Sequence, residues 1–356
     1  MRVALVHDDL VQWGGAERVL YALTELFPNA PIYTSVFDRS NKRLHNLFKD
    51  KDIRTSFMQK IPGWKYLYKS LMPVYPIAFE QFDFSNFDLV VSHTTRFAKC
   101  IITKPETKHV SLMHTPPRFL WNYSGVTYNK FLNFLFGFLR ILDRISAIRV
   151  DEIISCSNNA QKRVRKNYDV ETKVIQPFVE KERFLNKDPF NGGYYLIISR
   201  LNDYKKIDLA INVFNKNGNR LRIVGKGPME ERLKEMAQEN IDFLGNVSEK
   251  LLNEVILGCK AMIILAEEDF GLTSLEAQAA GKGVIAYKKG GVLETVINGE
   301  TGILFNEQTE KALEEALNKF EKSNFSKQKC MMNARNFSRE KFDHLVLTHC
   351  INSINV

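Results

Sequence analysis

Seven residues separate Glu268 from Glu276 in a segment that lies between the apolar runs Ala261–Leu265 and Gly283–Tyr287. The pattern predicts strand, loop, helix and strand, so Glu268 is expected in the loop and Glu276 one to two turns inside the helix. Phe270–Leu272 would open that helix, where a glycine lets a ligand approach the backbone and the helix dipole favours an anion. A carboxylate farther along accepts hydrogen bonds from ribose hydroxyls. The alternative is a solvated surface helix, but the glycine and small residues around the pair favour a binding site.

Arg200 and Lys205 are the second group of candidates, because both follow the apolar run Tyr194–Ser199 on a predicted strand-to-helix loop. Two fixed cations in such a loop can neutralise a diphosphate leaving group while negative charge builds during bond cleavage. The alternative is a basic loop that is simply solvated.

Gly14 and Gly15 follow the first apolar run, Arg2–His7, and open a helical stretch. Adjacent glycines let backbone N–H groups approach a phosphate or a sugar, although a tight turn without a ligand uses the same pair. The spacing is not G-x-G-x-x-G, which argues against a nicotinamide cofactor. His114 ends the run Lys108–Met113, and it is either a hydrogen-bonding partner of a ligand or a structural histidine.

These candidates lie on two series of alternating apolar runs and helical stretches, the pattern of an α/β protein with parallel sheets. The first series contains Arg2–His7, Leu89–Ser92, Lys108–Met113, Glu152–Ser155 and 173–178, and the second contains Tyr194–Ser199, Arg220–Gly225, Ile241–Gly245, Ala261–Leu265 and Gly283–Tyr287, with a helix expected over Pro228–Asn240. Because ligands of open α/β sheets bind at the carboxyl ends of the strands, two facing domains would hold a ligand in a central cleft. We predict doubly wound domains over 1–178 and 179–337, a hinge near Gln176–Phe190, and a helix over 338–356 that packs back on the first domain by fold analogy.

The net charge of +9 indicates anionic partners such as nucleotide diphosphates, lipid head groups or nucleic acid, or else a basic surface without a partner. The five cysteines include no C-x-x-C pair, which argues against a disulfide framework and a zinc site and favours a reducing cytosol. No apolar run reaches the length of a membrane-spanning helix, and Asp8 and Asp9 come too early for a signal peptide. We therefore expect a cytoplasmic protein.

Aromatic and basic residues are interleaved in two stretches, 54–80 and 128–149. Such residues either pack in a core or lie on an anionic membrane surface. We expect core packing for most of these aromatic residues, with contact to a membrane surface as the alternative.

The segment Glu268-Asp269-Phe270-Gly271-Leu272-Thr273-Ser274-Leu275-Glu276-Ala277 resembles the motif E-x-F-G-L-P-x-x-E-A of glycosyltransferase family 4. The chain departs from the motif at Thr273, where the family often has proline, but threonine is also suited to a helix N-terminus. Arg200 and Lys205 match an arginine and a lysine five residues apart in the same family. The resemblance spans nearly the whole chain, and is strongest over 199–305 and weakest over 30–80 and 306–356.

The resemblance implies a GT-B fold and a set of site residues. Glu268 would contact the transferred sugar, Glu276 the nucleotide ribose, and Arg200 and Lys205 the diphosphate. The full set of implied donor contacts is Gly14, Gly15, Arg200, Lys205, Gly225, Phe243, Leu244, Glu268, Phe270, Gly271, Leu272, Thr273 and Glu276. The implied catalytic residues are Glu268, His114, Arg200 and Lys205, and the residues expected on the acceptor side are Glu17, Arg118 and Trp121.

The same resemblance implies a retaining glycosyltransferase that moves a hexose from a nucleotide sugar to a glycan acceptor. The segment from His114 to Trp121 is similar to that of bacterial mannosyltransferases of polysaccharide assembly, which favours GDP-mannose and a role in surface polysaccharide or lipopolysaccharide assembly. A lipid-linked acceptor and a peripheral position on the inner face of the membrane would then be expected. No D-x-D motif is present near these loops, so we predict no metal and no cofactor besides the nucleotide sugar.

Two other classes of function are compatible with the same sequence. A nucleotide-sugar 2-epimerase shares the two-domain architecture but needs no acceptor. A non-catalytic subunit that binds a sugar nucleotide or RNA is compatible with the positive charge. The joint presence of Glu268, Glu276, Arg200 and Lys205 favours an enzyme, and nucleic acid is not expected as a partner.

Overall fold

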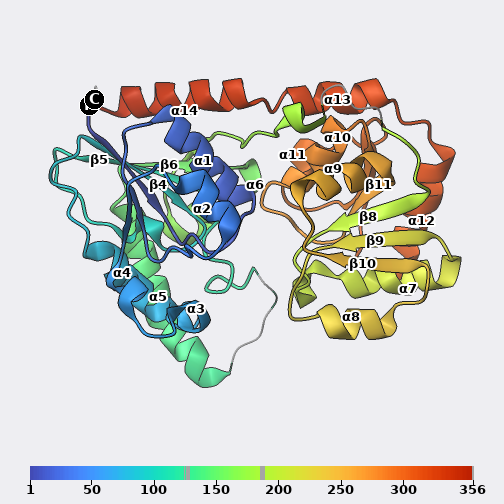
Figure 1. The fold of residues 1–356 in the computed structure, drawn as a ribbon, viewed down its shortest axis with the longest axis horizontal. Helices are drawn as coiled ribbons and strands as arrows, with labels where there is room; N and C mark the ends of the chain where they lie inside the picture. Colours follow the sequence, from blue (N-terminus) through green and yellow to red (C-terminus); the bar gives the residue numbers. More distant parts are fainter. Residues whose placement is uncertain (124, 126–128, 185–188, 355–356) are drawn as a thin grey trace. The chain divides into compact units, whose positions relative to one another are not determined.

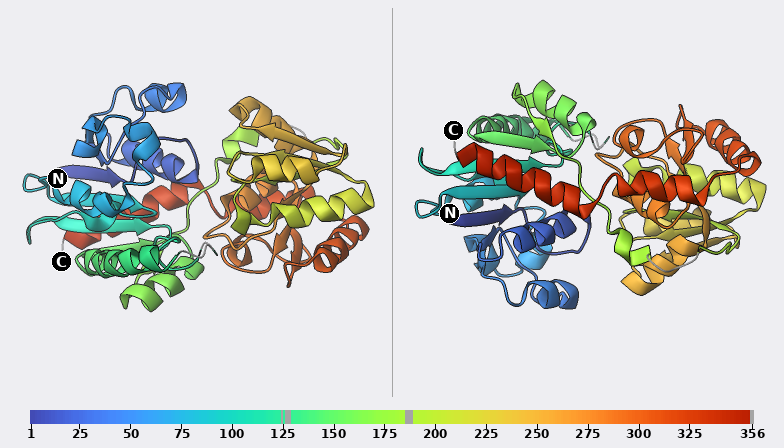
Figure 2. Two further views of the ribbon diagram at one scale, coloured as in Figure 1. Left: turned by 90° about the horizontal axis from the view of Figure 1, so that it is seen from below. Right: turned by 90° about the horizontal axis from the view of Figure 1, so that it is seen from above.

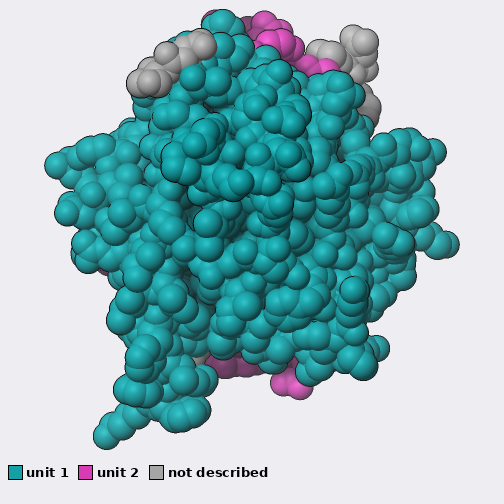
Figure 3. Space-filling model, turned by 90° about the vertical axis from the view of Figure 1, so that its left-hand side faces the viewer, with its two compact units in different colours: residues 1–176, 342–356 teal, residues 177–341 magenta. Residues whose placement is uncertain are grey.

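The computed structural model describes residues 1–123, 125, 129–184 and 189–354. The chain forms two compact units, which are distinguished by colour in Figure 3. The first unit consists of Met1–Gln176 and Phe342–Val356, and the second consists of Pro177–Lys341. Each unit is built around a parallel sheet with helices on both faces (Figure 1).

The sheet of the first unit has the strand order β3-β2-β1-β4-β5-β6-β7. Its strands are β1 (Val3–His7), β2 (Ile32–Thr34), β3 (Ile53–Thr55), β4 (Leu89–Thr94), β5 (Lys108–Met113), β6 (Glu152–Ser155) and β7 (Lys173–Val174). β1 pairs in parallel with both β2 and β4, so the order of the strands reverses between β1 and β4. β4 is buried along its whole length, as expected for a strand covered on both faces.

The helices of the first unit connect these strands and cover the sheet. They are α1 (Gly15–Leu26), α2 (Lys42–Phe48), α3 (Trp64–Leu67), α4 (Tyr75–Glu80), α5 (Lys130–Ile148) and α6 (Asn158–Tyr168), with 3-10 helices η1 (Phe57–Lys60), η2 (Met72–Val74) and η3 (Ala98–Cys100). α4 and α5 pack on the face that carries Ala4 and Val6. The C-terminal part of α14 (Arg339–Ile354) runs along the first unit (Figure 2).

The sheet of the second unit has the strand order β10-β9-β8-β11-β12-β13. Its strands are β8 (Tyr194–Ile198), β9 (Arg220–Val224), β10 (Ile241–Gly245), β11 (Cys259–Ile264), β12 (Gly283–Tyr287) and β13 (Gly302–Phe305). The order reverses between β8 and β11. In doubly wound sheets this reversal leaves a crevice at the carboxyl ends of the two strands, where ligands bind.

The helices of the second unit lie on both faces of its sheet (Figure 1). They are α7 (Ile207–Asn217), α8 (Glu230–Met236), α9 (Glu249–Gly258), α10 (Leu272–Ala279), α11 (Val292–Thr295), α12 (Glu310–Lys322) and α13 (Lys327–Arg335), with 3-10 helices η4 (Lys181–Phe184) and η5 (Asp203–Lys205). One core cluster joins α7, α8 and α12 to the sheet, as in the contacts of Phe214, Leu233 and Leu317. α9, α10 and α13 lie on the other face.

The predicted α/β fold class is confirmed, and the structure corrects the extent of individual elements. β2, β3 and β13 were not predicted, because three or four residues are too few to show a periodic pattern. The strand expected over 173–178 ends at Val174, since Pro177 has no N–H group and restricts the residue before it. The helix expected over Pro228–Asn240 covers only Glu230–Met236. Residues 185–188 of the expected hinge, residues 355–356 of the expected C-terminal helix, and Tyr128 of the aromatic stretch lie outside the described residues.

A buried ion pair holds the loop after β5 in place. The ammonium of Lys99 lies 2.5 Å from Oδ1 of Asp143, and both side chains are fully buried. Oδ2 of Asp143 accepts hydrogen bonds from Trp121 Nε1 at 2.7 Å and from the hydroxyl of Tyr168 at 2.6 Å. Burial alone would lower the pKa of Lys99, but the carboxylate of Asp143 raises that pKa above its ordinary value. The network therefore ties η3, α5 and α6 to the loop that carries Trp121.

Replacement of Asp143 by leucine is expected to lower the free energy of unfolding by about 3–5 kcal/mol, because it leaves the Lys99 ammonium buried without a counter-charge. The double variant Lys99→Met/Asp143→Leu should regain a large part of this loss. The control is Asp50→Ala, since Asp50 is exposed and its replacement should cost less than about 0.5 kcal/mol. Urea unfolding followed by circular dichroism measures all three, and equal losses for Asp143→Leu and Asp50→Ala would contradict the assignment.

Candidate active site

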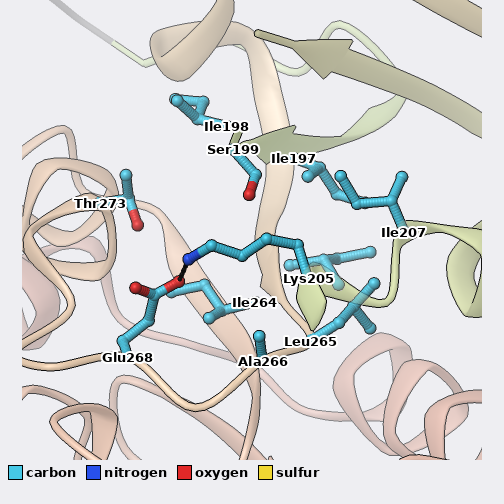
Figure 4. A pocket seen from close by; sticks show the side chains of 11 residues that line it. Ile197, Ile198, Ser199, Lys205, Ile207, Ile264, Leu265, Ala266, Glu268 and Thr273 are labelled. Atoms are coloured by element: carbon cyan, nitrogen blue, oxygen red, sulfur yellow. Dashed lines mark hydrogen bonds and ion pairs between the residues drawn. The ribbon is translucent and has the colours of Figure 1, made fainter. Parts of the chain in front are cut away.

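A pocket lies at the strand reversal of the second sheet, between the carboxyl ends of β8 and β11 (Figure 4). It is lined by Ile197, Ile198, Ser199, Lys205, Ile207, Ile263, Ile264, Leu265, Ala266, Glu268 and Thr273. Three of the predicted site residues, Lys205, Glu268 and Thr273, are thus brought together. The floor of the pocket is apolar and its polar groups come from the loops that follow the two strands, which is the usual composition of a ligand site.

Lys205 and Glu268 face each other across this pocket (Figure 4). Nζ of Lys205 lies 2.6 Å from Oε1 of Glu268, and the two side chains are 12% and 23% exposed. Lys205 ends η5, and Lys206 after it adopts a left-handed conformation, with φ of 54°, that turns the chain into α7. The pair places a fixed cation beside a fixed carboxylate. An anionic group that binds here meets the ammonium, and a neighbouring hydroxyl can donate to the carboxylate.

Arg200 lies on the same loop, but its side chain is exposed. Its guanidinium forms no ion pair or hydrogen bond with any residue that the structure describes. α10 begins next to the pocket with Gly271 as its N-cap, at φ of 91° and without a side-chain cap. The first turn of α10 therefore presents backbone N–H groups where a phosphate can be accommodated.

Two glycines hold the loops of the pocket by close backbone packing. A Cβ on Gly225 would lie 1.9 Å from the carbonyl oxygen of Ser199, and a Cβ on Gly290 would lie 2.3 Å from that of Glu268. Gly291 donates its N–H to the same Glu268 oxygen at 2.8 Å. The loop after β12 thus supports the segment that carries Glu268.

Glu276 lies in α10 and contacts Arg183 instead of the Lys205–Glu268 pair. Its Oε1 accepts a hydrogen bond from Nη1 of Arg183. Nη2 of Arg183 also donates to Oδ1 of Asn253 at 2.7 Å. Arg183 was not predicted as a site residue, because it lies in η4, a short helix that belongs to none of the motifs. A single sequence contains no pattern that identifies Arg183 as a site residue.

The other candidates of the second domain lie at the neighbouring strand ends. The N–H of Gly225, after β9, donates to the carbonyl of Gly245, the last residue of β10, at 2.9 Å. Phe243 and Leu244 are half-buried in β10. Neither of them lines the pocket between β8 and β11.

The candidates of the first domain lie at the carboxyl ends of β1 and β5. Gly14 is the N-cap of α1, in extended conformation and without a side-chain cap, and Gly15 is the first residue of that helix. Glu17 is buried in the first turn. Arg118 is half-buried in the loop after β5. The indole N–H of Trp121, expected on the acceptor side, is engaged by Asp143.

His114 follows β5 and its Nε2 lies 2.7 Å from Nε2 of His93. Asp8, at the end of β1, accepts hydrogen bonds from the backbone N–H groups of residues 95–98. Burial alone would raise the pKa of Asp8, but Arg96, His7 and these N–H groups hold it below its ordinary value. This carboxylate serves to fix the loop after β4.

In the part of the chain that is described, no group of three or more His, Cys, Asp or Glu side chains is placed to hold a metal ion.

Comparison with known proteins agrees with this architecture. Residues 13–183 match the family model "Glycosyltransferase Family 4", and residues 179–337 match "Glycosyl transferases group 1". An uncharacterized glycosyltransferase of Methanocaldococcus jannaschii is 26% identical over 54% of this chain and 60% of its own length. The alpha-1,3/1,6-mannosyltransferase ALG2 of Dictyostelium discoideum is 34% identical over 35% of this chain and 30% of its own length.

Among solved structures, Anabaena HepE in complex with UDP and glucose aligns with a TM-score of 0.70 and 16% identity. The alignment covers 98% of this chain and 99% of that chain. These findings define the class, a two-domain α/β protein of the GT-B type. The chain belongs to the glycosyltransferases, with a family 4 domain followed by a group 1 domain.

Replacement of Gly290 by alanine is expected to disturb the Glu268 loop, because the added Cβ collides with its backbone. The matched control is Gly299→Ala, since Gly299 also has a positive φ (84° against 76°) but no atom lies within 4 Å of the added Cβ. Both variants bear the backbone strain, and only Gly290→Ala bears the collision. We expect it to lower the free energy of unfolding by about 1–3 kcal/mol more than the control in urea titrations. Equal losses of unfolding free energy in the two variants would show that the Glu268 loop shifts to accommodate the added Cβ without cost.

Proposed function

We propose that this protein is an enzyme that transfers a hexose from a nucleotide-sugar donor to a glycan acceptor. The observation that carries the proposal is the Lys205–Glu268 pair at the strand reversal of the second sheet. This crevice is where doubly wound sheets bind nucleotides, and it combines a cation for a phosphate with a carboxylate for hydroxyl groups. Membership of the glycosyltransferases supports the same function.

The roles of the residues follow from their chemistry. Lys205 and the exposed Arg200 bind the diphosphate and stabilise the charge that develops on it, assisted by the N-terminus of α10. Glu268 accepts hydrogen bonds from hydroxyls of the transferred sugar, and Glu276 from those of the ribose. Arg183 keeps the Glu276 carboxylate in place through a hydrogen bond from Nη1. His114 contributes a contact to the sugar.

The transfer proceeds with retention at the anomeric carbon. The bond between this carbon and the diphosphate oxygen breaks, and the acceptor oxygen bonds to the carbon from the same face. The acceptor proton passes to the leaving phosphate oxygen, so no protein nucleophile is needed. Preorganised cations at the leaving group lower the barrier for such a step. The cations are supplied by Arg200 and Lys205, and we propose that the reaction needs no metal ion.

Mannose from GDP-mannose is the proposed donor group. The segment from His114 to Trp121 and the similarity to the mannosyltransferase ALG2 support mannose. The similarity to a protein solved with UDP and glucose supports a sugar and a base other than those of GDP-mannose. The identity of the donor is therefore the first property to determine. The proposed acceptor is a lipid-linked glycan in surface polysaccharide or lipopolysaccharide assembly.

A panel of nucleotide sugars, tested with EDTA present, identifies the donor through release of nucleoside diphosphate with and without a crude lipid-linked glycan. We expect acceptor-stimulated release from one donor, GDP-mannose. Arg200→Ala and Glu276→Ala should each lower this rate by about 10²-fold or more, since each removes a charged contact to the diphosphate or the ribose. Donor consumption without transfer to an acceptor would favour an epimerase. Release from no donor would reject the proposal.

α5 supports the proposed membrane position of the enzyme. Its exposed face carries large apolar side chains, namely Phe131, Leu132, Phe134, Phe138, Ile141, Leu142, Ile145 and Ile148. Lys130 and Arg144 flank them, and the acid of this helix, Asp143, is buried against Lys99. Of the stretch 54–80, Tyr75 and Phe79 are buried in the core, whereas Tyr66 is exposed. Among the described helices, none is both long and apolar enough to cross a membrane. An apolar face flanked by cations suits the surface of an anionic bilayer, and we propose that α5 lies on one.

Vesicle sedimentation tests this proposal. The protein is expected to bind vesicles of phosphatidylcholine with phosphatidylglycerol, and to bind vesicles of phosphatidylcholine alone much more weakly. Phe134→Ser/Phe138→Ser should weaken binding about tenfold or more, because two large side chains no longer enter the bilayer. The control Met332→Ser/Ile351→Ser changes two equally exposed apolar residues on other helices and should have no effect. Self-association lost in the α5 variant, without vesicle binding, would instead indicate a second copy of the chain.

A further inference from the structure

Three histidines form a continuous row at the strand reversal of the first sheet. His7 ends β1, His93 lies near the end of β4, and His114 follows β5. Nδ1 of His93 lies 3.2 Å from Nδ1 of His7, and Nε2 of His93 lies 2.7 Å from Nε2 of His114. His7 and His93 are buried, and His114 is partly exposed. The middle ring therefore uses both of its nitrogen atoms on other imidazoles.

The proton on His7 is fixed by a backbone group. Nδ1 of His7 lies 3.2 Å from the carbonyl oxygen of His93, as well as from Nδ1 of that residue. A carbonyl oxygen can only accept, so Nδ1 of His7 must carry a proton. Nδ1 of His93, which faces the same proton, must then be the unprotonated nitrogen of its ring.

The proton on His93 consequently lies on Nε2. Burial, together with the neighbouring His114 and His7, lowers the pKa of His93 well below its ordinary value, so the ring is neutral at physiological pH. A neutral ring with a bare Nδ1 carries its single proton on Nε2 and donates it to Nε2 of His114. This leaves Nε2 of His114 as an acceptor.

The backbone of His114 is held as well as its ring. Its N–H donates to the carbonyl of Thr94 at 3.0 Å, and the thiol of Cys156 donates to its carbonyl at 3.1 Å. Both contacts come from the neighbouring strand ends, at β4 and β6. These contacts fix the main chain at His114, and the 2.7 Å contact with His93 sets which ring nitrogen faces that residue.

We propose that His7 and His93 are positioning residues that hold His114 as the neutral tautomer with its proton on Nδ1, so that His114 donates a hydrogen bond to an oxygen of the transferred sugar. This inference rests on the proposed function, which brings the sugar to His114. A neutral donor of fixed direction selects a sugar with an oxygen at that point. It is also preorganised, because no ring has to rotate or change its protonation state when the donor binds.

The tautomer of His114 can be observed directly in the full chain. Protein labelled with ¹⁵N-histidine gives long-range ¹H–¹⁵N spectra in which a protonated and a bare ring nitrogen differ clearly, and His114→Gln identifies the His114 signals. The wild-type protein should show Nδ1–H on His114 and Nε2–H on His93. A proton on Nε2 of His114 in the wild-type protein would overturn the inference.

Two variants of His93 separate positioning from mere packing. In His93→Gln, the amide oxygen can accept from His7 and the amide N–H group can donate to His114, so the Nδ1–H tautomer and most of the transfer rate should be retained. In His93→Leu, the donor to His114 is lost. We expect His114 to shift to the Nε2–H tautomer and kcat to fall about tenfold, the effect of one hydrogen bond made in the transition state.

The outcomes distinguish this inference from the proposed function. Thermal unfolding of both variants shows whether either loses its fold, and the tautomer is then compared at equal folded fraction. Equal transfer rates for His93→Leu and wild type, despite a changed tautomer, would overturn the role of the row in the reaction. Failure of the wild-type protein to use any nucleotide sugar would reject the proposed function, and it would leave the tautomer result standing.

Discussion

The reversal of strand order between β8 and β11 is the constraint on which the candidate site depends. Because all strands of the second sheet are parallel, their carboxyl ends share one edge, and the reversal sends the loops after β8 and β11 away from each other. The crevice that remains is narrow enough for Lys205 on one loop to meet Glu268 on the other. Gly225 and Gly290 permit this approach, because they pack against the backbone of the two loops without a Cβ. The first sheet has the same reversal between β1 and β4, and there it gathers His7, His93 and the Asp8 carboxylate.

The parallel fold could be predicted from the sequence because its central strands are continuous apolar runs, such as β4 and β11. Short edge strands, such as β3, could not, since three residues carry no period. The pocket residues Lys205, Glu268 and Thr273 could be predicted because each lies in a segment that follows such a run and resembles a family motif. Arg183 and His93 could not. Arg183 approaches Glu276 from a segment without a motif, and His93 lies one residue beyond the strand predicted over Leu89–Ser92, so their partners become apparent only once the chain has folded.

Many polar groups are buried in the first unit, and two clusters of them are satisfied by specific partners. The Lys99–Asp143 pair is completed by Trp121 and Tyr168, and Asp8 is surrounded by backbone N–H groups. Such networks contribute little net stability compared with an apolar core, but they fix the geometry of the loops that they join. They concentrate at the carboxyl edge of the sheet, where loops must hold side chains in defined positions.

The place of the C-terminal helix in the first unit affects the order in which the two units can fold during synthesis. The first unit is discontinuous, since residues 1–176 are completed only by residues from Phe342 onward. Within that last segment Val346 and Cys350 are buried, and His349 lies 2.6 Å from Glu152. The ribosome therefore releases the second unit, which is continuous in sequence, before the first has received its last helix. The later domain in the sequence can finish folding first, while the earlier one waits for the residues of this helix.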